Sequence, residues 1–121
     1  SATDANIILG DTTGIVTAVV ASDSAENLNT NSTNAITGND ALTLTVSGTS
    51  AEASDLIGWD GKTSVNVKAD GTVTTITGTA ANIQTVVTAA TIDTAANVNV
   101  TVDSGTAMGI LILSDFVIAN Q

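Results

Sequence analysis

Acidic side chains are the residues of this chain that could do chemistry, because the sequence has no His, Cys, Arg or Tyr. General acid–base catalysis would depend on Asp, Glu or the two lysines, Lys62 and Lys68. The acidic pair considered for this role, Asp55 and Asp60, adjoins turns, where carboxylates usually mark a solvated helix end. No glycine-rich phosphate-binding motif is present. We therefore expect no enzyme, and no residue is assigned a catalytic or cofactor-binding role.

Calcium is the metal that carboxylates and turn carbonyls could bind in such a chain. The candidate ligands are Asp40 in Gly-Asn-Asp and two aspartates that precede glycine, Asp60 and Asp70. None of them lies in a DxDxDG loop or in a Gly-Gly-x-Gly-x-Asp repeat. The favoured interpretation is solvated turn aspartates, with calcium binding as the weaker hypothesis.

The aromatic inventory is one Trp and one Phe. Trp59 stands between Gly58 and Asp60, and an exposed Trp in a turn could stack on a sugar. Because the chain has so few large side chains, we favour Trp59 as the residue that closes the apolar end of a helix layer. Binding of a glycan stays an alternative.

The formal net charge is −10. Nucleic-acid binding depends on Lys and Arg, so this charge excludes it and also disfavours an anionic membrane surface. Copies of the chain should repel one another, and salt should reduce that repulsion. The apolar runs 110–113 and 116–119 are interrupted by Asp115 and are shorter than the roughly 20 residues that span a bilayer.

A short phrase occurs four times, at 19–26, 45–52, 75–82 and 102–109. Its anchor residues are Asp23, Thr49, Thr79 and Thr106, a spacing typical of stacked repeats. We expect one repeat domain, 1–121, with approximate units 1–40, 41–70, 71–96 and 97–121.

Each unit should open with a strand, because Val, Ile and Thr dominate residues 14–20, 42–46, 72–76 and 97–102. The anchors are then predicted to cap short helices, and Glu26 and Glu52 stand at the capping-box spacing from Asp23 and Thr49. One apolar helix face is expected in each unit, although the first unit offers only Leu28. The other members of these faces are Leu56, Ile57, Ile83, Val86, Val87, Ile110 and Leu113.

Strands joined by helical crossovers run parallel, and such crossovers are almost always right-handed. The predicted fold is an α/β repeat, a right-handed solenoid-like stack of strand and short-helix units with a mainly parallel sheet. The alternative is an all-β sandwich. Asp70-Gly71 fits either a hairpin or the corner of a coil.

Three phrases, 60–67, 74–83 and 93–102, resemble repeats of very large Thr/Ala-rich surface proteins of cyanobacteria and other aquatic bacteria, which are adhesin-like, motility-associated or S-layer-like. Similar stretches occur in structural proteins of phages that infect marine cyanobacteria. The resemblance implies an extracellular or cell-surface structural role, with a virion as the alternative location. It supplies no catalytic residue.

The function expected from the sequence is self-assembly into a surface filament, lattice or adhesin stalk. A stack has two open ends. Sheet edges that no Lys or Pro protects can pair with the strands of another copy. The partners would be copies of the chain itself, and the alternatives are a phage decoration or fibre protein and a glycan-binding adhesin module. The residues predicted to associate are Ile7, Ile8, Leu9, Ile110, Leu111, Ile112, Leu113, Phe116, Val117 and Ile118.

Overall fold

Every strand pairing in the part of the chain that the structure describes is parallel. The computed structural model describes residues 1–30 and 39–103. Strands and short helices alternate along the chain, so the predicted mixed α/β class is confirmed and the all-β sandwich is wrong. The elements are α1 (Ala2–Asp11), β1 (Thr17–Val19), α2 (Ala25–Thr30), β2 (Ala41–Thr43), β3 (Ser50–Glu52), α3 (Ala53–Asp60), β4 (Val67–Ala69), β5 (Thr75–Gly78), α4 (Ala80–Thr88), β6 (Ile92–Thr94) and β7 (Asn99–Val102).

The pairings form small parallel sheets with a nearly constant sequence offset. β1 pairs with β2, β4 with β6, and β3, β5 and β7 lie side by side in that order. Each residue pairs with the one 24 or 25 positions later, as Thr17 does with Ala41 and Ser50 with Thr75. A single bridge between Thr45 and Lys68 links the β1–β2 pair to the β4–β6 pair.

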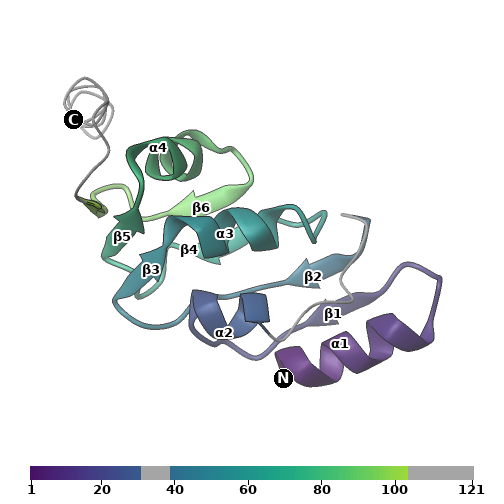
Figure 1. Ribbon diagram of the computed structural model, residues 1–121. Helices are drawn as coiled ribbons and strands as arrows, with labels where there is room; N and C mark the ends of the chain where they lie inside the picture. Colours follow the sequence, from purple (N-terminus) through teal and green to yellow (C-terminus); the bar gives the residue numbers. More distant parts are fainter. Residues whose placement is uncertain (31–38, 104–121) are drawn as a thin grey trace.

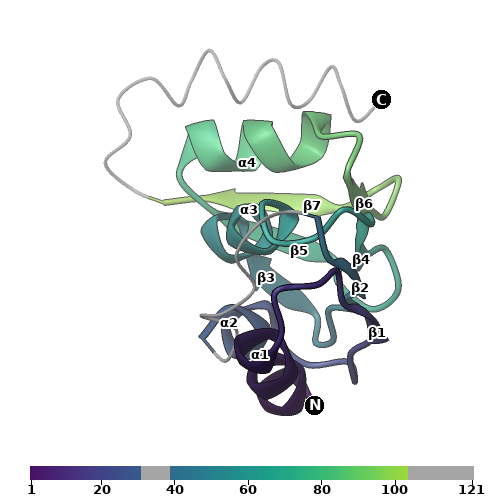
Figure 2. The ribbon, with the colours of Figure 1, turned by 90° about the vertical axis from the view of Figure 1, so that its right-hand side faces the viewer.

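The helices form a second layer beside the strands. α2 contacts α3 and α3 contacts α4, so the three helices follow one another in the same order as the strands (Figure 1). α1 lies at the N-terminal end of the molecule, on the opposite side from α4 (Figure 2). α2, α3 and α4 therefore each contact nearby strands as well as the helix before or after them in this series.

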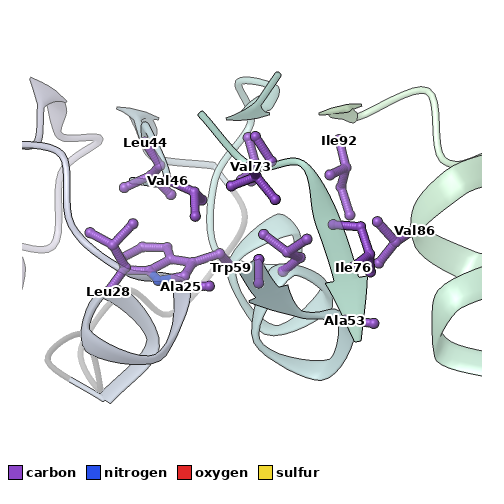
Figure 3. Packing of buried hydrophobic residues seen from close by; sticks show 14 of the residues in the cluster. Ala25, Leu28, Leu44, Val46, Ala53, Trp59, Val73, Ile76, Val86 and Ile92 are labelled. Carbon is purple, nitrogen blue, oxygen red and sulfur yellow. The ribbon is translucent and has the colours of Figure 1, made fainter. Parts of the chain in front are cut away.

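The core lies between the sheets and the helices and is built mainly of aliphatic side chains (Figure 3). The period-2 pattern at 42–46 is confirmed, because Leu42, Leu44 and Val46 are buried and the intervening threonines are half-buried. The predicted helix faces are confirmed at the positions that the structure describes. Among them, Leu28, Leu56, Ile83 and Val86 are fully buried, and Ile57 and Val87 pack against the core.

The helix starts were predicted correctly only for α4. Thr79 is its N-cap, and the Thr79 hydroxyl accepts a hydrogen bond from the backbone N–H of Asn82. The capping box at Asp23 and Glu26 is wrong, because the Ser24 hydroxyl accepts the bond from the Asn27 N–H instead. The expected helix after Thr106 lies outside the described residues.

The capping box at Thr49 and Glu52 is also wrong, for a reason of strand pairing. Residues 50–52 form β3, which pairs with residues 75–77 of β5, and α3 begins only at Ala53. The backbone N–H of Thr74 bonds the carbonyl of Thr49, so the counterpart of Thr49 is Thr74 and not Thr79. Gly48-Thr49 thus precedes β3, whereas Gly78 is the last residue of β5 and Thr79 comes directly after it.

The Asp70-Gly71 step is a corner and not a hairpin. It joins β4 to β5, and these two strands belong to different parallel sheets. A second change of direction occurs at Gly78, which has φ +135°. A Cβ at that position would lie 2.6 Å from Oε1 of Glu52. Gly78 therefore allows the chain to leave β5 for α4 in a conformation that other residues rarely adopt.

We predict that Gly78→Ala lowers the free energy of unfolding by about 1–3 kcal/mol, because it places a side chain at positive φ against Glu52. Gly71→Ala is the matched control, since a Cβ there meets nothing within 4 Å. That variant should be neutral or gain up to about 1 kcal/mol. Urea unfolding followed by circular dichroism measures both, and equal effects would contradict the assignment.

Candidate functional site

The three aspartates considered as calcium ligands lie apart from one another in the fold. Asp40 is buried, and its Oδ1 accepts a hydrogen bond of 2.8 Å from the backbone N–H of Val16. Asp60 ends α3 and accepts a bond of 2.8 Å from the Thr91 hydroxyl. Asp70 is exposed at its corner. Among residues 1–30 and 39–103, no group of three His, Cys, Asp or Glu side chains could hold a metal ion.

The buried polar side chains connect neighbouring strands. The Thr63 Oγ1 accepts bonds from the backbone N–H groups of Leu42 (3.0 Å) and Val65 (3.2 Å). The same hydroxyl lies 2.9 Å from the carbonyl oxygen of Leu42 and 3.1 Å from that of Asp40. Thr63 and Asp40 thus supply hydrogen bonds where the backbone ladders have none, and their role is structural.

Trp59 is a core residue, as the favoured interpretation predicted. Its side chain is 1% exposed and lies beside Leu28 and Ala25 of α2 (Figure 3). Its Nε1 is buried and has no hydrogen-bond partner in the structure. The Nζ of Lys62 lies 5.5 Å from the centroid of its ring. The Trp59 ring is therefore not exposed for stacking on a sugar, as the glycan-binding hypothesis required.

Asp55 and Asp60, the acidic pair considered for catalysis, are both engaged by other elements of the fold. Asp55 Oδ1 accepts a bond of 2.9 Å from the side-chain amide of Asn29, whereas Asp60 bonds Thr91. The two carboxylates lie on the same helix, α3, and each is directed to a different neighbour. Asp55 thus connects α3 to α2, and Asp60 connects α3 to the segment just before β6.

The predicted N-terminal association residues fall on α1, which sequence reasoning did not predict. Leu9 is 7% exposed and packs against the core, whereas Ile7 and Ile8 are 57% and 52% exposed. The signal for the helix was its capping box, since the Ser1 hydroxyl accepts from the Asp4 N–H and the Asp4 carboxylate bonds back to Ser1. The C-terminal association residues, 110–113 and 116–118, lie outside the described residues.

Two further exposed aliphatic side chains accompany Ile7 and Ile8 in the N-terminal part of the chain. Ile15 precedes β1 and is 73% exposed, and Val19 ends β1 and is 82% exposed. They alternate with the inward residues of the first strand, which is the signal that could have identified them. The exposed large aliphatic residues of the described chain are thus Ile7, Ile8, Ile15 and Val19, which we call the N-terminal apolar surface.

Two surface carboxylates favour the folded state through local hydrogen bonds. The pKa of Asp4 is lowered by the Ser1 hydroxyl and then by the terminal ammonium, and the pKa of Asp23 by the Asn27 amide and then the Ser24 N–H. A lowered pKa contributes stability above the pKa of the unfolded chain, and the contribution is lost as pH falls through the folded value. Both contributions therefore act at neutral pH and disappear in acid.

A comparison of the chain with protein-family models, curated proteins and solved structures finds no match. In the part of the chain that the structure describes, no helix has the length and apolar character needed to cross a membrane. The geometry of the described residues is therefore the basis for proposing a function.

We predict that Thr63→Val, which keeps the shape but removes the hydroxyl, lowers the free energy of unfolding by about 1–3 kcal/mol. The cause is the buried N–H of Leu42, which loses its acceptor. Thr72→Val is the matched control, because Thr72 is exposed, and its effect should stay within about 0.5 kcal/mol. Chemical denaturation of the two variants is the measurement; an indistinguishable pair would show that the Thr63 hydroxyl is dispensable.

Proposed function

We propose that this chain is an extracellular structural protein that self-associates end to end into a filament, lattice or adhesin stalk, and that it is not an enzyme. The proposed architecture is a right-handed solenoid-like stack. The observation that carries the proposal is the register, in which each strand pairs with the strand 24 or 25 residues later. The extracellular location rests on the resemblance to Thr/Ala-rich surface proteins.

The register supports a stack because each coil of the chain repeats the same path. β2, β3 and α3 form one coil, and β4, β5 and α4 form the next. β6 and β7 continue the two ladders into a further coil. Units of this kind bury their apolar faces mainly against their neighbours. The unit at each end of the stack therefore has one face that no neighbouring unit covers.

The N-terminal end offers an apolar surface to a second copy. α1 lies beyond β1 and α2 at this end of the molecule (Figure 1). Ala5 and Leu9 of α1 pack on the core, and Ile7 and Ile8 leave more than half of their surface exposed. Such exposed aliphatic residues on a chain of net charge −10 favour a contact that removes them from water.

The opposite end supports pairing through the backbone. β6 and β7 are the last strands of their sheets, and each is bonded to a described strand on one edge only. Edge strands of this kind template further pairing. The sequence that follows contains the apolar runs 110–113 and 116–118. The occupant that we assign to this end is the N-terminal end of another copy, where β1 is bonded to a described strand on one edge only.

We predict that the purified chain assembles as salt concentration rises, because salt screens the repulsion between acidic copies. Ile7→Lys/Ile8→Lys should raise the protein concentration needed for assembly more than tenfold, since burying one Ile contributes about 1.5–3 kcal/mol. The double variant also lowers the net negative charge, which by itself would favour assembly. Analytical ultracentrifugation and negative-stain microscopy measure the effect.

The matched control is Ser54→Lys/Thr72→Lys, which makes the same charge change at two exposed positions in the middle of the described chain. It should assemble at least as readily as the unmodified protein. A chain that stays monomeric at high concentration and high salt contradicts the proposal. If the two double variants assemble equally well, the N-terminal apolar surface takes no part in the contact between copies.

A further inference from the structure

Asn29, Asp55 and Lys62 form a cluster between α2 and α3, which we call the Lys–Asn–Asp cluster. The Nζ of Lys62 donates a hydrogen bond of 3.2 Å to Oδ1 of Asn29. The Nδ2 of Asn29 donates one of 2.9 Å to Oδ1 of Asp55. All three side chains are half-buried. The amine of Lys62 therefore lies on one side of the Asn29 carboxamide, and the carboxylate of Asp55 lies on the other side.

The backbone of α3 makes room for this carboxamide. A Cβ at Gly58 would lie 2.9 Å from Oδ1 of Asn29 and 3.3 Å from its Cγ. Gly58 follows Asp55 by one helical turn, and Lys62 comes just after the C-cap of the same helix at Gly61. Only a glycine at position 58 leaves the Asn29 side chain in contact with the helix backbone between the two charged groups.

Charge fixes the orientation of the Asn29 amide. An ammonium can only donate a hydrogen bond and a carboxylate can only accept one, so Oδ1 must face Lys62 and Nδ2 must face Asp55. The ring of Trp59, with its centroid 5.5 Å from Nζ, restricts the lysine side chain from the core side. The nucleophile, the electrophile and a proton carrier are therefore held in a defined order.

We propose that Lys62 and Asn29 become joined by an isopeptide bond that forms within the folded chain. The lone pair of Nζ attacks Cγ of Asn29, which is one bond from the Oδ1 that Nζ already contacts. The Nζ–Cγ bond forms, the Cγ–Nδ2 bond breaks, and Nδ2 leaves as ammonia. The reaction exchanges one amide for another, so no oxidant, reductant or activated group is consumed.

Asp55 is the catalytic residue of this proposal because it contacts the leaving nitrogen. The ammonium of Lys62 must lose one proton to solvent before Nζ attacks and a second proton once the Nζ–Cγ bond has formed, and the departing Nδ2 must gain one. The Asp55 carboxylate, bonded to Nδ2, can take the second proton from Nζ, which is by then bonded to the same carbon, and give it to the leaving group. Holding an amine and an amide at contact distance replaces a bimolecular encounter, an effect worth effective concentrations of about 10⁵–10⁸ M in well-oriented cases.

The bond would tie the first repeat to the second. It would connect side chains 33 positions apart and so anchor α2, a helix of six residues, to α3. A cross-link that closes a loop of this length restricts the unfolded chain and favours the folded one. The inference does not rest on self-association, because every atom involved belongs to one chain.

The test is the intact mass of the purified protein under denaturing conditions, followed by trypsin digestion of the denatured chain. The expected mass is lower than that of the sequence by one molecule of ammonia. Lys62 and Lys68 are the only tryptic sites. An amidated Lys62 resists cleavage, so the digest should contain a 1–68 fragment and not the separate fragments 1–62 and 63–68.

Three variants separate the proposed chemistry from other sources of ammonia loss. Lys62→Arg keeps a cation beside Trp59, and Asp55→Ala removes the proton carrier; both should show the full sequence mass. Asp60→Ala is the matched control, because this carboxylate on the same helix bonds Thr91, and it should still lose ammonia. Fragmentation of the 1–68 peptide should locate the link between residues 29 and 62.

The intact mass and the tryptic digest of the unmodified protein test the proposal independently of the three variants. A chain of full sequence mass that is cut after Lys62 overturns it. Ammonia loss that persists in Lys62→Arg comes from another side chain and overturns it equally. Failure of this test leaves end-to-end assembly unaffected, and failure to assemble leaves the mass result unaffected, so the two proposals are judged separately.

Discussion

Parallel pairing at a nearly fixed offset of 24 or 25 residues is the constraint on which the other features of this structure depend. It places each paired strand beside the strand whose residues stand 24 or 25 positions later. Each inward side chain then packs against the side chain of its paired residue in the neighbouring strand. This favours small aliphatic residues such as Val67 and Ile92, which pair directly, over large rings that would fit only once.

The same constraint explains the polar residues that the core tolerates. Where a backbone N–H group has no carbonyl partner in the neighbouring segment, a buried polar side chain must supply the acceptor. Asp40 does so for Val16, and Thr63 does so for Leu42. On the helix side, Asn29 connects to both Asp55 and Lys62. These five side chains thus connect segments of the chain that are distant in sequence.

The sequence predicted the features that depend on local pattern. The alternation at 42–46, the cap of α4 at Thr79 and the burial of Trp59 follow from period, capping chemistry and the scarcity of large side chains. The errors arise where pairing overrides a local signal. Residues 50–52 carry a capping pattern, yet they extend as β3 because bonds to β5 satisfy their backbone. The contact of Asn29 with Lys62 has no local signal, since it depends on how α2 packs on α3.

The central claim is that strands stack along the axis of an assembly built from copies of this chain. X-ray diffraction from aligned, salt-induced assemblies tests this claim most directly, because strands perpendicular to a long axis give a reflection near 4.7–4.8 Å along it. The account predicts this reflection on the meridian. Protein that remains monomeric, or assemblies whose strand spacing appears on the equator, would contradict it.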